Sequence, residues 1–480
     1  MTVLGGGRSA PGAEPSPDAA GAQAPGTGAP YPRRMAVDAP PRPAPSATGT
    51  WAAALVGLGV WTALVWGAIV WGARVVEAQP EMRISAAPFV GTWERMVADE
   101  GALRVAVLLG ALAVVAAPPL ARRLPWRALV AGAGALAVAW LLALNAVDGP
   151  EALREPLTSR YEYVAGVPDV EAAGGAFGYL DTFTERIAAY PTHVRGHPPG
   201  LVTGLWAADQ VGLDPVEVNL ALVLAGWGGA VAAALVALRD VAGEALARRS
   251  APLVALAPGA IWAGTSPDAF FAGVTAAAVA ALVLATGREG RRADVTAAVG
   301  GVLVGVSMLL SYATGPVLAV PLAVALLRRR LRPLVVGGVA AVVVLLAAGL
   351  AGFWWPAGLL ATREEYHKGL SQFRPLSYFV VGNLAAVAVA VGPSLGAGLA
   401  GLARRLRPGI LVVGALVGVA AADLSGLSKG ETERIWLVFV PWLAGAAAFL
   451  PGPTDRVHRG WVALQVAVGI GFQVALRTPW

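Results

Sequence analysis

The residues of this chain that are best suited to chemistry form one short run, His193-Val-Arg-Gly-His197-Pro-Pro-Gly200. Imidazole and guanidinium groups can hold an anion such as a phosphate by charge-assisted hydrogen bonds. Two histidines four residues apart can also bind zinc, but they need a helix to do so. Gly196 and the tandem prolines disfavour a helix here. We therefore predict that His193, Arg195 and His197 position an anion, and we predict no zinc site at the two histidines.

Two more groups of ionisable residues lie beside long apolar runs. Asp268 follows Thr265-Ser-Pro at the edge of such a run, where an ionisable group is costly and functional by default. A helix N-cap is the alternative interpretation. Lys368 and Arg374 follow the pair Trp354-Trp355, and paired tryptophans mark a membrane interface. These two basic residues are candidates to hold a lipid phosphate.

A last group, Lys429, Glu433 and Arg434, lies between two apolar runs. Such a density of charge is typical of a site for a charged headgroup. Helix capping combined with ion pairing explains it equally well, because loops are the only watery places left for polar residues in so apolar a chain.

The composition indicates what must position these residues. The chain is 56% hydrophobic and 14% charged, which predicts that most of it lies in lipid. It has no cysteine, which excludes disulfides, thiolate metal sites and cysteine nucleophiles. The net charge of +6 does not indicate nucleic acid, because the arginines stand in short clusters between apolar runs.

The order of apolar runs predicts an all-α polytopic fold. Residues 1–50 are rich in Pro, Ala, Gly and Ser and predict a disordered cytoplasmic tail. From Trp51 onward, apolar stretches of roughly 15 to 25 residues recur, each near the length that crosses a bilayer. Counting them predicts about thirteen transmembrane helices.

Arginine-rich separators alternate with uncharged or mixed ones, which predicts the orientation. The basic separators should be cytoplasmic; they are Arg122-Arg123 with Arg127, Arg239 with Arg248-Arg249, Arg288 with Arg291-Arg292, Arg328 to Arg332, Arg404-Arg405 with Arg407, and Arg456 with Arg459. Basic and non-basic separators fall on alternate sides of the membrane only if residues 200–213 do not cross it. These residues are then expected to form a short interfacial helix before the span that begins near Val216. The loop 148–213 and its candidate residues then face outward.

These features together resemble the GT-C superfamily of membrane glycosyltransferases, which includes the protein mannosyltransferase and aminoarabinose transferase groups. The resemblance rests on an acid-bearing outer loop, on His197-Pro-Pro opening a juxtamembrane helix, and on Ser266-Pro-Asp268. It covers roughly residues 128–287 by motif and the rest of 128–480 only by span number and topology. Residues 51–127 would add two N-terminal spans.

The resemblance implies transfer of a sugar from a polyprenyl-phosphate carrier to an acceptor glycan, lipid or protein at the outer face of the plasma membrane. It also implies an acidic base early in the first outer loop, for which Glu162 and Asp148 are the candidates. The family usually shows Asp near its first span, whereas Glu162, which we favour, is a glutamate. The substrate-binding residues would be Tyr163, His193, Arg195, His197, Asp268, Lys368, Arg374, Lys429, Glu433 and Arg434.

Two rival hypotheses stand beside this one. A transporter or lipid flippase would need ionisable residues deep in its spans and Gly- or Pro-broken helices at the midplane. A non-catalytic polytopic protein would keep the fold without the chemistry. No cofactor is certain from the sequence, and a divalent cation held by Asp268 with another acid is left open.

Overall fold

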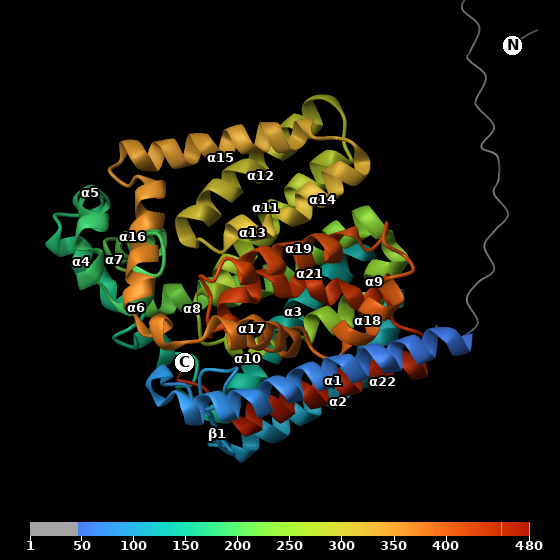
Figure 1. Ribbon diagram of the computed structural model, residues 1–480. Helices are drawn as coiled ribbons and strands as arrows, with labels where there is room; N and C mark the ends of the chain where they lie inside the picture. The colour runs from blue at the N-terminus through green and yellow to red at the C-terminus, as the bar shows by residue number, and fades with distance from the viewer. Residues whose placement is uncertain (1–46, 453, 480) are drawn as a thin grey trace, which may run out of the picture. The chain divides into compact units, whose positions relative to one another are not determined.

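The computed structural model describes residues 47–452 and 454–479 (Figure 1). The tail predicted over residues 1–50 therefore lies outside the described residues except for its last four. Those four residues belong to the first helix, α1 (Ala47–Ala78). The helix thus begins slightly before the expected boundary.

Long apolar helices dominate the described part of the chain. Seven of them are long and apolar enough to cross a membrane; they are α1, α2 (Glu100–Arg123), α3 (Trp126–Asn145), α8 (Pro215–Ala242), α11 (Asp268–Thr286), α12 (Gly290–Leu310) and α15 (Arg332–Leu350). The strands found there are β1 (Thr92–Trp93) and β2 (Leu476–Arg477), which pair antiparallel. The expectation of an all-α multi-pass membrane protein is confirmed at this level.

Several segments counted as spans in the sequence are shorter or broken helices. The pair α17 (Leu376–Val391) and α18 (Ser394–Leu402) bends by 98° and counts as an eighth span if taken together. The other short helices of this part are α9 (Glu244–Ala255), α10 (Ala260–Ala263), α13 (Thr314–Val317), α14 (Ala319–Arg328), α19 (Ile410–Leu424), α20 (Thr432–Ile435) and α21 (Val440–Ala444), while the last helix, α22 (Asp455–Ala475), has 21 residues but is not among the seven. The number thirteen stays a prediction.

Glycine permits a close contact between α8 and α11. A Cβ at Gly226 of α8 would lie 2.4 Å from the Cα of Phe270 on α11, and one at Gly273 would lie 2.5 Å from Gly226. Larger side chains at either position would push the two helices apart. Small residues at helix contacts are what membrane helices use in place of a hydrophobic driving force.

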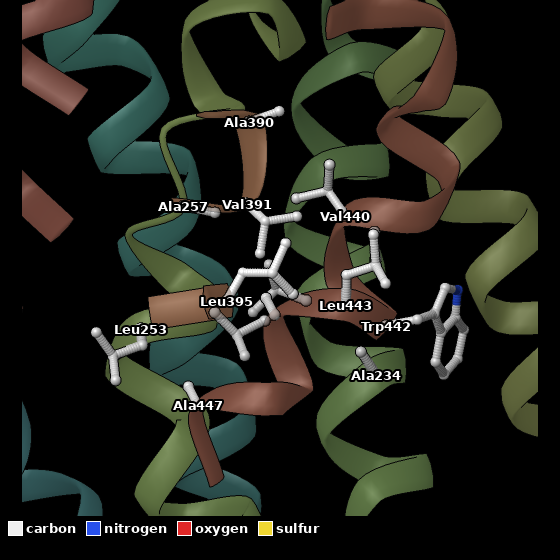
Figure 2. Close-up of a cluster of buried hydrophobic side chains, with 14 of the residues drawn as sticks. Ala234, Leu253, Ala257, Ala390, Val391, Leu395, Val440, Trp442, Leu443 and Ala447 are labelled. Atoms are coloured by element: carbon white, nitrogen blue, oxygen red, sulfur yellow. The ribbon is translucent and has the colours of Figure 1, made fainter. Parts of the chain in front are cut away.

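Two helix breaks meet in the interior. Gly259, in the break between α9 and α10, donates from its backbone N–H to the carbonyl of Ala390, 2.7 Å away at the end of α17. Gln465 of α22 donates from Nε2 to the carbonyls of Val391 at 2.7 Å and Leu253 at 3.4 Å. Apolar side chains surround this region (Figure 2). The breaks are therefore closed by hydrogen bonds within the protein.

The arginine-rich turns are linked to one another at one end of the long helices. Arg248 donates to the carbonyls of Ala121 and Leu124, both at 2.8 Å, which ties α9 to the turn between α2 and α3. Arg249 reaches the carbonyl of Leu450, and Arg328 reaches that of Asp240. The basic separators thus share one end, as the alternation predicted. Which side of a membrane this end faces stays a prediction.

Short helices gather at the opposite end, at the left of Figure 1. They are α4 (Val167–Ala172), α5 (Ala176–Arg186), α6 (Thr192–Arg195), α7 (Gly200–Asp209) and α16 (Trp355–Lys368). Buried aromatic residues of this region, among them Tyr179 and Phe183 of α5 and Phe353 just before α16, form a second core. Helix α7 is ten residues long, too short to span, as expected for an interfacial helix.

Candidate functional site

One buried group of side chains unites seven of the residues that the sequence singled out. We call it the Arg434 cluster; its members are Glu162, Tyr163, His193, His197, Asp268, Arg374 and Arg434, joined by Ser266 and Glu431. These residues come from loop 148–213, the start of α11, the segment before α17, and α20. The chain is folded so that segments distant in the sequence meet at one point.

Arg434 lies at the centre of the cluster and is 1% exposed. Its Nη1 lies 3.5 Å from Oε1 of Glu162 and 3.5 Å from Oδ2 of Asp268, and its Nη2 lies 3.6 Å from Oε2 of Glu431. Burial alone lowers the pKa of a guanidinium, but these three carboxylates outweigh it and raise the pKa of Arg434. The residue therefore stays positively charged.

Glu162 pairs with His193 as well as with Arg434. The Nδ1 of His193 lies 2.5 Å from Oε1 of Glu162, and both side chains are nearly fully buried. Burial raises the pKa of Glu162, yet the charges of His193 and Arg434 outweigh burial and hold the pKa below its usual value of 4.5. The backbone N–H of His193 also donates to the carbonyl of Tyr161 at 2.9 Å, which holds α6 against the glutamate.

The second oxygen of Glu162, Oε2, is buried and has no hydrogen-bond partner within the described residues. A buried carboxylate oxygen without a partner costs free energy. It is also a carboxylate oxygen that could accept a hydrogen bond from the hydroxyl of a bound molecule. Of the atoms in the cluster, this oxygen is the best suited to act as a general base.

His197 and Asp268 form the other side of the cluster. The Nδ1 of His197 carries a hydrogen, because it lies 2.9 Å from the carbonyl of His193, which can only accept. Its Nε2 faces Oδ1 of Asp268 at 3.9 Å, and the ring packs edge-on against Tyr163. Burial lowers the pKa of His197, with Asp268 opposing the shift. Burial therefore favours the neutral form of the His197 imidazole.

Asp268 is held at the first residue of α11. The hydroxyl of Ser266 donates to its Oδ2 at 2.5 Å, and its own backbone N–H donates to Oγ of Ser266 at 3.1 Å. A carboxylate here is also favoured by the helix dipole. Asp268 thus lies at a helix terminus, as the alternative interpretation expected, and it also forms an ion pair with Arg434.

Two further cations, Arg374 and Lys429, adjoin Arg434 through Glu431. The Nη1 of Arg374 lies 3.6 Å from Oε1 of Glu431 and donates to the carbonyl of Lys429 at 2.8 Å. The Nζ of Lys429 donates to the carbonyl of Ser371 at 2.9 Å. Burial, with the nearby charge of Arg374, lowers the pKa of Lys429. Lys429, another of the predicted substrate-binding residues, therefore lies next to the cluster.

Four of the predicted residues have their partners elsewhere. Asp148 accepts from Nε2 of Gln473 at 2.8 Å, near the end of α22. Lys368 is exposed and pairs with Glu365 at 3.1 Å. Arg195 lies 3.7 Å from the same glutamate. Of the two candidate bases, only Glu162 lies in the Arg434 cluster.

Glu433 is the fourth of these residues, and its hydrogen-bond partner is the backbone of Val90. Its Oε1 accepts from the backbone N–H of Val90 at 3.0 Å, and its Oε2 is buried without a partner in the described chain. Burial raises its pKa to about 7, despite the hydrogen bond from Val90. It therefore supports the segment before α2.

The expectation that His193 lies outside a helix is wrong. Residues Thr192–Arg195 form the single turn of α6, with Pro191 at the N-cap position, where a proline removes no needed donor. Gly196 ends the turn, so the helix is too short to present both histidines on one face as zinc ligands. Within residues 47–452 and 454–479, no group of three or more His, Asp or Glu side chains is arranged to hold a metal ion.

Two cluster members were not among the predicted site residues. Ser266 stands inside the motif that led to Asp268, so its closeness to that carboxylate could have been anticipated. Glu431 adopts a φ of +62°, which is rare for a residue other than glycine. Such a conformation at a turn that forms ion pairs is typical of functional strain, but no feature of the sequence reveals it.

Comparisons with models of known protein families and with curated proteins found no match to this chain. The site alone therefore supports the function proposed below.

Proposed function

We propose that the chain is a membrane-embedded glycosyltransferase, which moves a sugar from a polyprenyl-phosphate carrier to an acceptor hydroxyl. The observation that carries the proposal is the pairing of an ionised Glu162 with the buried guanidinium of Arg434, 3.5 Å away. One group is suited to take a proton from the acceptor, and the other to bind the phosphate that leaves.

In the proposed step, the acceptor oxygen bonds to the anomeric carbon as the bond from that carbon to the phosphate oxygen breaks. The electron pair of the broken bond stays on the lipid phosphate, whose charge Arg434 neutralises. The acceptor proton passes to Oε2 of Glu162, the oxygen that has no partner in the described chain. Displacement from the opposite face inverts the configuration at the sugar.

The cluster in this structure is closed, since Glu162, Asp268 and Arg434 are each at most 3% exposed. Binding of the donor phosphate at Arg434 therefore requires Glu162 or Asp268 to give up its ion pair. The exchange of one anion for another keeps the guanidinium paired throughout. In this proposal, Arg374 and Lys429 attract the phosphate from the adjoining side.

The topology belongs to the same proposal. We assign about thirteen spans of the GT-C type, two of them additional at the N-terminus, in a plasma membrane. The end that holds the basic turns is cytoplasmic, by the excess of arginine there, and the Arg434 cluster faces outward. The partners are then a polyprenyl-phosphate sugar, the lipid bilayer, and an acceptor whose identity the site does not reveal.

The 98° bend between α17 and α18 favours a second candidate, a transporter or lipid flippase. Unwound carbonyls at such a break can coordinate an ion or a substrate. Here, however, the carbonyls of Ala390 and Val391 already accept from Gly259 and Gln465. The charged residues instead gather at the outer helix ends, where transfer chemistry would place them.

A donor-cleavage assay separates the candidates. Membranes from cells that express the chain, and membranes from cells that do not, are given a set of polyprenyl phosphates that carry radiolabelled sugars. The glycosyltransferase proposal expects label to leave the lipid and join an acceptor only when the chain is present. A transporter would move intact labelled lipid across vesicles without cleaving it. A non-catalytic protein would do neither.

A further inference from the structure

We propose that the turn between α2 and α3 binds an anionic phospholipid, at the end of the molecule opposite the Arg434 cluster. The proposal is independent of the proposed function. It rests on an apolar groove that opens beside a surplus of arginines.

The groove lies between α2, α3 and α9 and has a volume of about 250 Å³. Every residue that lines it is apolar; Leu109, Leu120, Leu136 and Pro252 are examples. Leu112, which also lines it, is 64% exposed in the protein alone. A surface of this kind on a membrane helix faces hydrocarbon, so the matching occupant is an acyl chain.

The groove reaches the basic end of the helices. Ala121 and Leu124 line it, and their carbonyls accept from Arg248. Trp126 begins α3 there, and the guanidinium of Arg239 lies 4.6 Å from the centre of its ring. A tryptophan beneath arginines is the arrangement expected at the level of lipid headgroups.

Charge at this turn is not balanced. Five arginines lie here, of which Arg122 pairs with Asp455 while Arg239 and Arg248 share Glu244. Arg123 and Arg127 are exposed, and neither has an ion-pair partner in the described part of the chain. An anionic headgroup above a chain in the groove would complete the charge balance.

The test is lipid binding by the purified full chain, measured by native mass spectrometry. Phosphatidylglycerol and phosphatidylcholine with identical acyl chains are titrated separately. We expect phosphatidylglycerol to bind more tightly, by about fivefold for each of the two unpaired arginines. Equal affinity for the two lipids would overturn the proposal.

Two pairs of variants locate the site. R123Q with R127Q should remove the preference, whereas R291Q with R292Q, which removes the same charge from exposed positions on α12, should keep it. Gly132 lines the groove, and a Cβ at this position would meet open space, so Gly132→Leu should fill the groove and weaken the binding of both lipids. Gly59→Leu, at an equally open position on α1, is the control. If R123Q with R127Q shows the same lipid preference as R291Q with R292Q, the lipid binds elsewhere. The same conclusion holds if Gly132→Leu and Gly59→Leu bind the lipids equally well.

Discussion

Arg434 and Glu162 stand 272 positions apart in the sequence, yet their side chains meet at 3.5 Å in a site closed to water. The contact joins loop 148–213 to the segment that precedes α21. Both the stability of this end of the molecule and the proposed chemistry depend on this contact.

We expect Arg434→Gln to be strongly destabilising. The change leaves Glu162, Asp268 and Glu431 buried without their shared cation, and breaking a buried ion pair on one side costs about 3–5 kcal/mol. Thermal unfolding of the detergent-purified protein at pH 7 measures the loss. Arg95→Gln is the matched control, because Arg95 makes an exposed ion pair with Glu100 and its loss should cost at most about 1 kcal/mol. Equal melting temperatures for the two variants would contradict the account.

Glu162→Gln should reduce the loss of folding stability that the protein suffers as the pH falls. The folded pKa of Glu162 is lowered below its usual 4.5, so the stability it contributes is present above that value and is lost as the pH falls further. The glutamine cannot titrate and shows no such loss. Unfolding measured between pH 3 and 7 tests this. Glu155→Gln, at an exposed position of the same loop, should keep the wild-type slope, and a wild-type slope in Glu162→Gln would refute the prediction.

Glu433→Gln should act in the opposite direction. Burial raises the folded pKa of Glu433 to about 7 from 4.5, so ionisation of this residue destabilises the fold as the pH rises between those values. The amide keeps an acceptor oxygen for the N–H of Val90 and carries no charge. The variant should melt at a higher temperature than the wild type at pH 8 and close to it at pH 5. A lower melting temperature at pH 8 would show that the charge is needed.

The two helix breaks give a prediction for the interior. Gln465→Leu removes the donor that serves the carbonyls of Val391 and Leu253, and leaving such buried acceptors unpaired costs about 1–3 kcal/mol. Gln372→Leu, which removes an exposed glutamine bonded to nearby carbonyls, should have little effect on the melting temperature. A small effect at both positions would mean that water replaces Gln465 at the breaks.

The sequence was most informative where the argument was local. The length of the apolar runs predicted α3, α8 and α11, and the need to close the alternation of loops predicted the short helix α7. Each of these inferences depends on residues within one segment. The broken helices were harder to predict from the sequence. A proline or glycine in an apolar run reveals neither the angle of a bend nor which groups bond to the backbone at the break.

The candidate site could be predicted by residue type but not by arrangement. Asp268 and Arg434 were picked out as ions beside apolar runs, and Glu162 as the acid of the long loop that the family resemblance made a candidate base. Their convergence depends on how distant helices pack, which no local pattern encodes. For the same reason the sequence kept Asp148 as a second candidate base beside the favoured Glu162, although its partner is Gln473 on the last helix. Lys368 looked like a phosphate ligand but lies exposed beside Glu365.

Sugar release from the labelled polyprenyl-phosphate donor, compared between wild type, Glu162→Gln and Glu155→Gln, tests the central claim most directly. The melting temperatures of all three proteins are first measured at the assay pH, and the assay is run well below the lowest of them. The account predicts transfer by the wild type and by Glu155→Gln, and a loss of at least about a hundredfold in Glu162→Gln, as removal of a general base requires. Equal transfer by the three proteins would contradict the role of Glu162, and no transfer by any of them would contradict the proposed function.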